Sequence, residues 1–454
     1  MDTKTIKSIA DYVYKHKEEY IDLLQRFCSQ PCVSATNLGL REMSNIVKTE
    51  LRRLGANPIS FYDEDHPIIL GTLDYQQKRT LLIYNHYDVV PTEPNKEWNT
   101  PPFEPTIIGD RIYGRGVADN KGSMLSRYCA IDLCQKLFGE LPVNLKILVE
   151  GQEEIGSPQI GRLVKEHSEL LYSDGIIWEG GGRDINDGPL QVSLGVKGSA
   201  GFELKCRCAE DDMHSMYAAI VPNPVWRIIK ALSLCMDEKG NIKIPYINKN
   251  LMCYGKVELD SLKTFEYDEK GILNMVGRKS FINGFTGEAL KEQLFLRPSL
   301  NIQGLHSGYE GDGAKAVLPA KAVCKMDIRL VAGQNVDDFF KCLREYLDDN
   351  GFKDIEIVRG NDMKPYRGSD DSMIAQAVIN NVEAVYGMPP AVYINMAGAT
   401  GMGRFCERLK TPAVCFGVYN DDSRLHAPNE NIKIDDYLKG IILTAAVFFD
   451  FGRM

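Results

Sequence analysis

Residues 81–91, LLIYNHYDVVP, decide the fold class of this chain. An apolar run passes directly into a polar cluster in which one residue separates His86 from Asp88, as at the carboxyl end of a buried parallel strand. Open α/β sheets bind their ligands at such strand ends. Residues two apart on a strand share a face, so Asp88 can hold one imidazole nitrogen of His86 while the other nitrogen binds a metal. A core histidine satisfied by a nearby acid is the alternative interpretation.

Length and composition narrow the class of protein. A chain of 454 residues exceeds the usual size of one hydrophobic core, so we expect two domains or one domain with a large insertion. Its net charge of −9 argues against nucleic acid as a partner. The N-terminus lacks the apolar segment of a signal peptide, and the late apolar run 441–449 is too short to span a bilayer. We therefore expect a cytoplasmic protein without a membrane partner.

The segments around this stretch predict further elements of an α/β domain. Helical periodicity predicts one helix over residues 5–29 and another over 41–54, and residues 68–73 predict a strand. The proline- and asparagine-rich stretch 91–114 is too long for a simple connection. It predicts a functional loop over a site.

A glycine-rich motif, GRGVADNKG at residues 114–122, leads into an amphipathic helix and places Asp119 near the helix N-terminus. The motif lacks the spacings of the known phosphate-binding loops, and it carries an acid where a phosphate site would avoid one. A cation ligand explains Asp119 better.

Acidic residues also end the next two predicted strands. The strand over residues 143–149 runs into EGQEEIGS, with Glu153 and Glu154 side by side, and the strand over 175–178 runs into Glu179. Adjacent carboxylates repel each other unless a cation or a proton neutralises them. A solvated acidic turn is the alternative for the glutamate pair. The regular arrival of acids at successive strand ends favours a metal site.

From residue 196 the pattern changes to β-α-β-β-α-β, with a long irregular excursion between the first helix and the second strand. This order predicts a ferredoxin-like unit, which we place at residues 196–367. Residues 1–195 and 368–454 then form the two parts of the catalytic domain. We expect a three-layer α/β domain with a mainly parallel sheet, interrupted by an α+β lid and dimerisation domain.

Taken together, NHYDVVP, GRGVADNKG, EGQEEIGS, WEGGG, MHS and LHAPNE resemble the M20 metallopeptidase family, nearest its cytosolic, carnosine-type dipeptidase branch. The likeness runs from about residue 20 to the C-terminus and keeps the order of every motif. It implies two divalent ions per subunit, zinc or else manganese, with Asp119 as the bridge. In this resemblance one ion is held by His86 and Glu179, and the other by Glu154 and His426.

The resemblance also implies roles for residues that bind no metal. Glu153 would be the general base and Asp88 would orient His86. In the inserted domain, His214 would stabilise the oxyanion in the partner subunit of a homodimer, and Arg329 would bind the substrate carboxylate. From the residues alone, both could be ordinary surface side chains. Further implied features are substrate contacts by Gly398 and Thr400 and a cis peptide at Asp119–Asn120.

We therefore expect an amide hydrolase that cleaves dipeptides or other small peptides with a free carboxylate. An N-acyl-amino-acid deacylase is the alternative, because dipeptidases often carry Asp where this chain has Glu179. Ala316 stands where the carnosine-dipeptidase pattern has threonine, which argues against carnosine itself as the substrate. A scaffold without turnover is disfavoured, since it has no need for clustered acids whose repulsion costs stability.

Overall fold

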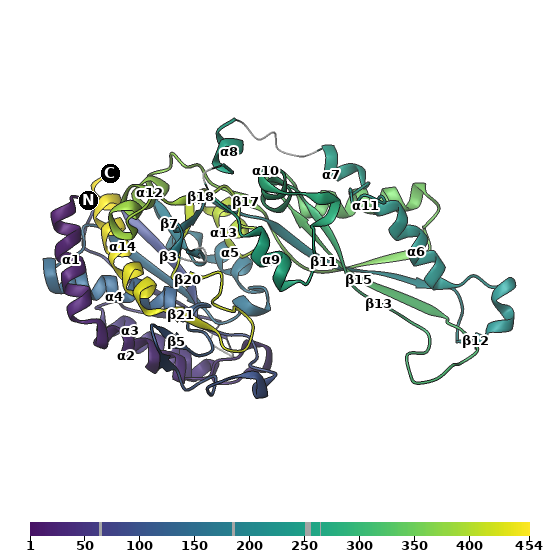
Figure 1. The fold of residues 1–454 in the computed structure, drawn as a ribbon, viewed down its shortest axis with the longest axis horizontal. Coiled ribbons are helices and arrows are strands. Elements are labelled where there is room, and N and C mark those ends of the chain that lie inside the picture. The colour runs from purple at the N-terminus through teal and green to yellow at the C-terminus, as the bar shows by residue number, and fades with distance from the viewer. Residues whose placement is uncertain (63–65, 184–186, 250–255, 264) are drawn as a thin grey trace. The chain divides into compact units, whose positions relative to one another are not determined.

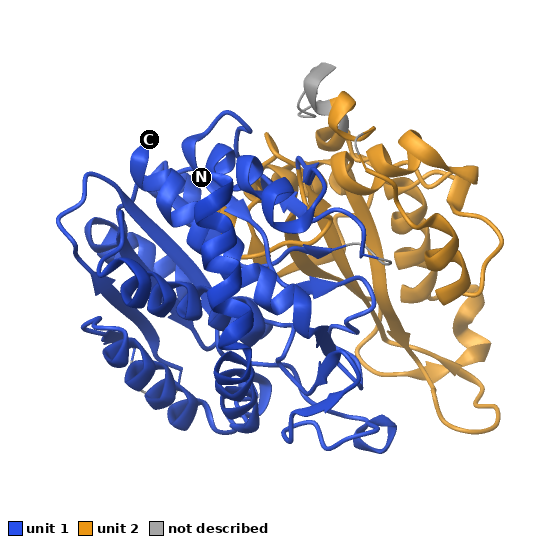
Figure 2. Ribbon diagram, turned by 60° about the vertical axis from the view of Figure 1, so that its left-hand side comes forward, with its two compact units in different colours: residues 1–195, 367–394, 404–454 blue, residues 196–366, 395–403 orange. Residues whose placement is uncertain are grey.

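The computed structural model describes residues 1–454 except 63–65, 184–186, 250–255 and 264. The chain folds into two compact units (Figure 2): residues 1–195, 367–394 and 404–454 form unit 1, and residues 196–366 and 395–403 form unit 2. Each unit contains a hydrophobic core of its own. Among the described residues, no helix combines the length and the apolar character needed to cross a membrane.

Unit 1 is built on an eight-stranded sheet in the order β1-β2-β6-β3-β7-β19-β9-β18. Its four central strands, β6, β3, β7 and β19, run parallel to one another. Every residue of β3 after Thr80 is buried, as is all of β7, because helices cover both faces. The predicted three-layer α/β fold is confirmed. The strands are β1 (Ile59–Phe61), β2 (Ile68–Leu73), β3 (Thr80–His86), β6 (Asn144–Glu150), β7 (Gly175–Trp178), β9 (Gln191–Ser193), β18 (Ala391–Tyr393) and β19 (Ala413–Cys415).

The C-terminal helix organises the helices of unit 1, since it packs against α1, α4 and α12 (Figure 1). The single helix predicted over residues 5–29 is wrong. His16 leaves helical geometry at φ −105° and ψ 18°, so that α1 can pack on α14 and α2 on α4. The helices are α1 (Thr3–Lys15), α2 (Lys17–Ser29), α3 (Leu40–Arg53), α4 (Lys121–Phe138), α5 (Ile160–Leu171), α12 (Met373–Tyr386), α13 (Met402–Leu409) and α14 (Ile434–Arg453).

A small three-stranded sheet joins two distant loops of unit 1. Its order is β21-β5-β4, with β4 (Thr106–Ile108), β5 (Arg111–Tyr113) and β21 (Asn431–Lys433). The stretch 91–114 is therefore not a loop throughout, as the sequence predicted, because its second half forms the β4-β5 hairpin. The pairing of β21 with β5 brings the loop before β21 next to the loop after β5.

Unit 2 is a four-stranded antiparallel sheet in the order β13-β15-β11-β16. The helices α6 and α11 pack on it, which confirms the ferredoxin-like arrangement. The excursion after α6 is not wholly irregular, since its described residues include the short helices α7 (Pro245–Lys249), α8 (Lys256–Ser261), α9 (Glu269–Met275) and α10 (Gly287–Lys291). The main elements are β11 (Gly198–Arg207), α6 (Pro224–Cys235), β13 (Ser299–Ser307), β15 (Lys321–Leu330), α11 (Val336–Asp349) and β16 (Ile355–Met363).

Candidate metal centre

The carboxyl end of β3 positions the first two candidate residues. His86 is the last residue of the strand, and its Nδ1 lies 3.0 Å from the backbone oxygen and 3.3 Å from Oδ1 of Asp88. The buried Asp88 carboxylate also accepts hydrogen bonds from the backbone N–H groups of Glu153, at 3.2 Å, and Glu154, at 3.1 Å. Asp88 therefore ties the turn after β6 to the end of β3, and the Nε2 atom of His86 points away from it.

Asp119 lies between two imidazoles. Its Oδ1 is 3.0 Å from Nε2 of His86, and its Oδ2 is 3.2 Å from Nε2 of His426. The Asp119–Asn120 peptide bond is cis, as the resemblance implies. Each oxygen of one carboxylate thus faces a different histidine, which suits a carboxylate that bridges two cations.

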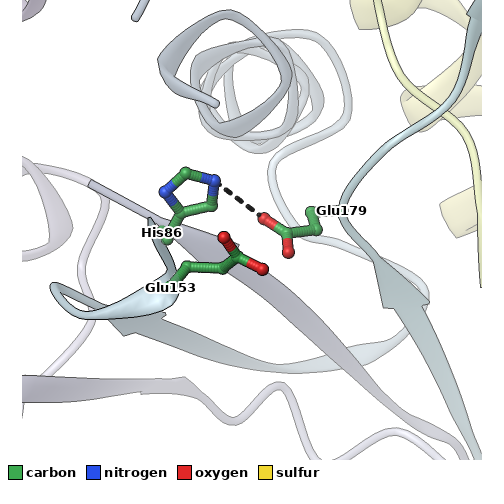
Figure 3. Close-up of side chains that lie close together, drawn as sticks. All are labelled: His86, Glu153 and Glu179. Atoms are coloured by element: carbon green, nitrogen blue, oxygen red, sulfur yellow. Dashed lines mark ion pairs between the residues drawn. The ribbon is translucent and has the colours of Figure 1, made fainter. Parts of the chain in front are cut away.

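A glutamate completes each side of this arrangement. Oε2 of Glu179 is 3.1 Å from Nε2 of His86, and Oε2 of Glu154 is 3.1 Å from Nε2 of His426. Figure 3 shows the carboxylates of Glu153 and Glu179 turned toward the His86 imidazole. The centre therefore consists of two histidine–glutamate pairs that share Asp119.

Burial and mutual repulsion set the protonation of these acids. Burial raises the pKa of Glu179 to about 8. Burial, and then the charge of Glu179, raise the pKa of Glu153 well above its ordinary value. Hydrogen bonds to Asp119 and Glu154 raise the pKa of His426 to about 10. Glu153, Glu179 and His426 thus retain protons that a cation would displace.

The donor set fits a divalent cation on independent grounds. Oε1 of Glu154 is buried and has no hydrogen-bond partner among the described residues. Two sets of side chains offer ligand atoms within 4.8 Å of one another, namely His86, Glu153 and Glu179, and His86, Asp119 and Glu154. Imidazole nitrogens and carboxylate oxygens are ligands of Zn²⁺ and Mn²⁺. The orphaned oxygen and the crowded acids are what a cation would satisfy.

A buried arginine that sequence reasoning missed supports the strand ends. Arg127 on α4 donates hydrogen bonds to the backbone oxygens of Tyr84, Trp178 and Phe416, at 2.9, 3.0 and 3.0 Å. These carbonyls belong to β3, to β7 and to the segment after β19. The available signal was a charged residue among the mainly apolar residues in the first half of α4, where a charge is buried only if it has partners.

Four further candidate residues belong to unit 2. His214 is exposed, and its Nδ1 accepts a hydrogen bond from the N–H of Met216 at 3.1 Å. Arg329 on β15 is half-buried, with Nε 3.5 Å from Oδ2 of Asp327. Gly398 accepts a backbone hydrogen bond from Lys197 at 3.0 Å, and the hydroxyl of Thr400 accepts one from Met402 at 3.3 Å. These contacts describe unit 2 by itself and leave the proposed roles as predictions.

Comparison with known proteins identifies the family to which the chain belongs. The sequence profile of peptidase family M20/M25/M40 matches residues 82–449, and the chain belongs to this family. It is a metallopeptidase-type hydrolase, and membership implies divalent metal ions.

Individual relatives cover almost the whole chain. The human Beta-Ala-His dipeptidase is 26% identical over 99% of this chain and 93% of its own length. The Cys-Gly metallodipeptidase dug1 of Schizosaccharomyces pombe is 26% identical over 97% of each chain. Among solved structures, the M20 family metallo-carboxypeptidase Sso-CP2 of Sulfolobus solfataricus superimposes with a TM-score of 0.91 at 36% identity, covering 96% of this chain and 100% of that one.

Proposed function

We propose that this protein is a two-metal amide hydrolase that cleaves dipeptides or other small peptides with a free C-terminal carboxylate. The observation that carries the proposal is the position of Asp119 between two histidine–glutamate pairs. The names of the relatives support the substrate class, since two are dipeptidases and one is a metallo-carboxypeptidase. Hydrolysis by such enzymes releases an amino acid that carries a free carboxylate.

Five side chains would hold the ions, with Asp119 shared by both. We assign His86 and Glu179 to one ion, and Glu154 and His426 to the other. When bound, two divalent ions, zinc or else manganese, would polarise the scissile carbonyl and lower the pKa of the attacking water. Asp88 would keep His86 in the tautomer that presents Nε2, because its own carboxylate faces Nδ1.

Glu153 is proposed as the general base. Its carboxylate would take a proton from the attacking water and deliver it to the leaving nitrogen. Burial raises the pKa of Glu153 above its ordinary value, which is the direction that suits a base that must later act as an acid. Its backbone N–H is held by Asp88, so the side chain starts from a fixed point.

Unit 2 would contribute groups that act on the substrate. The imidazole of His214 would donate a hydrogen bond to the developing oxyanion in the partner subunit of a homodimer. The guanidinium of Arg329 would bind the substrate carboxylate in a two-pronged pair. Gly398 and Thr400 would contact the substrate. The homodimer and a cytoplasmic location stay predictions from the sequence.

The test is a substrate panel assayed with the zinc-loaded and the manganese-loaded protein. It contains free dipeptides, a tripeptide, the same dipeptides with C-terminal amides, and N-acetyl amino acids. We expect hydrolysis of the free peptides and much slower hydrolysis of the amides. Hydrolysis of N-acetyl amino acids without cleavage of dipeptides would favour the deacylase instead, and inactivity on the whole panel would refute both.

A further inference from the structure

Glu430 is a fully buried carboxylate outside the two histidine–glutamate pairs of the candidate centre. Its Oε1 accepts hydrogen bonds from the backbone N–H groups of Ala118 and Asp119, each at 2.9 Å. Its Oε2 accepts from the N–H of Gly116 at 2.9 Å and from Nη1 of Arg115 at 2.8 Å. Both oxygens are thus occupied by the loop that carries Asp119.

The topology explains why these groups meet. The loop that holds Asp119 follows β5, and Glu430 immediately precedes β21, which pairs with β5. The backbone oxygen of Glu430 also accepts a hydrogen bond from the N–H of Gly114 at 3.0 Å. Glu430 therefore holds this loop through both its main chain and its side chain. It lies more than 300 positions after the loop in the sequence.

The same late loop carries His426, four residues before Glu430. Three of its residues, Arg424, His426 and Asn429, have positive φ values of 57°, 59° and 64°, a region that most nonglycine residues adopt uncommonly, so contacts help to hold the loop in this shape. The side chain of Asn429 supplies such contacts. It accepts from the N–H of Asn99 at 2.7 Å and donates to the oxygen of Glu97 at 2.9 Å. The loop is therefore held at residues 429 and 430, just after His426.

We propose that Glu430 is a positioning residue that fixes Asp119 and His426 relative to each other. The inference rests on the metal centre of the proposed function. Because Oε1 binds the N–H of Asp119 itself, movement of Glu430 would shift the carboxylate that the two sides of the centre share. Because Glu430 and His426 lie on one tethered loop, the same movement would displace the second histidine. Loss of the Glu430 contacts should therefore weaken both ion sites together.

Glu430→Gln is the most direct test. The amide keeps the size of the side chain but replaces one acceptor oxygen with an N–H donor, which must face either the N–H groups of Ala118 and Asp119 or those of Gly116 and Arg115. The matched control is Asp132→Asn. Asp132 is a buried carboxylate on α4, bonded to Arg53 at 2.7 Å and to Lys136 at 2.9 Å.

The measurement is titration with Co²⁺, whose visible absorption reports the geometry of its ligands, together with thermal unfolding of the metal-free proteins. We expect Glu430→Gln to bind Co²⁺ about 10- to 100-fold more weakly than wild type, with an altered spectrum. Asp132→Asn should unfold at a lower temperature yet bind Co²⁺ as tightly as wild type. Arg115→Lys, which keeps the charge and the three backbone donors, should lose less affinity in the same direction, and it serves as the test if Glu430→Gln does not fold.

Unchanged Co²⁺ affinity and spectrum in Glu430→Gln, or in Arg115→Lys where that variant replaces it, would overturn the proposal. Equal weakening in Asp132→Asn would also overturn it, because the effect would then follow from general loss of stability. Peptide hydrolysis is assayed on the same samples. A wild-type protein that binds Co²⁺ but cleaves no peptide contradicts the proposed function, whereas the affinity comparison still decides the role of Glu430.

Discussion

The sheet of unit 1 and the sheet of unit 2 distribute their polar residues differently. In β3 and β7 almost every side chain is buried, so polar groups collect where the strands end. In β11, buried and partly exposed residues alternate, because helices cover one face of an antiparallel sheet. A polar side chain at a strand end of unit 1 is therefore conspicuous, whereas one on a strand of unit 2 looks like its neighbours. Chemistry is easier to locate in the first kind of sheet.

The largest effect should come from Glu153→Gln, which tests whether the acids of unit 1 divide into ligands and a base. An amide cannot accept the proton of the attacking water, so kcat should fall about 10²- to 10⁴-fold while two metal ions remain bound. Metal content and kcat are measured on one preparation. Loss of a metal would instead assign Glu153 to the ligands, as its distance from His86 and Glu179 allows.

Phe339→Ala should separate the stability of the two units. Phe339 is fully buried in the core of unit 2, with its ring centroid 5.2 Å from that of Phe340 and 6.0 Å from that of Phe202. We expect the free energy of unfolding of unit 2 to fall by about 3–5 kcal/mol, while unit 1 keeps its affinity for Co²⁺. Denaturant titration followed by circular dichroism and Co²⁺ absorption measures both. Loss of Co²⁺ affinity together with the loss of stability would show that metal binding by unit 1 depends on the stability of unit 2.

His214→Ala asks whether unit 2 acts across a homodimer. Removal of one oxyanion donor should lower kcat about 10²- to 10³-fold. When His214→Ala is mixed with Glu153→Gln under subunit exchange, each mixed dimer holds one intact base that receives one intact histidine. About half of the wild-type activity per dimer should return. If exchange is demonstrated and activity stays absent, His214 does not act in the partner subunit.

The smallest effect should come from Arg329→Lys. Lysine keeps the charge but loses the planar fork that grips a carboxylate, so KM for a free dipeptide should rise about tenfold, the scale of one charge-assisted hydrogen bond at about 1.5 kcal/mol. The C-terminal amide of the same dipeptide is the matched control, and its KM should not change. Equal changes for both substrates would place Arg329 outside carboxylate recognition.

The fold could be predicted because the residue patterns along the chain agree with the strands and helices that the structure contains. Apolar runs mark the parallel strands, and alternation marks β11 and β15. Helical periodicity marks α6 between these two strands and α11 after β15. The break at His16 could not be predicted, because both sides carry helical periodicity and only the different packing partners of α1 and α2 separate them. Residues 395–403, which fold with unit 2, carry no local signal of that association.

The candidate site divides in the same way. His86, Asp119, Glu154 and Glu179 could be proposed because each follows an apolar run or opens a helix. The supporting contacts of Arg127 and Glu430 could not. Arg127 reaches carbonyls on three segments that only the assembled sheet brings together, and Glu430 meets the Asp119 loop through the pairing of β5 with β21. Local patterns report which residues are chemically unusual, whereas the partners that hold them follow only from the assembled fold.

The β5–β21 pairing also determines when the candidate metal centre can assemble during synthesis of the chain. A ribosome makes His86, Asp119 and Glu179 before any residue of unit 2, and it makes His426 and Glu430 after the last residue of that unit. Until then, Asp119 and Glu179 lack the loop that carries His426. Their carboxylates stay hydrated, because burial of an unpaired charge is costly. The contacts that complete the centre therefore join residues far apart in the sequence, and such contacts slow the folding step that forms them.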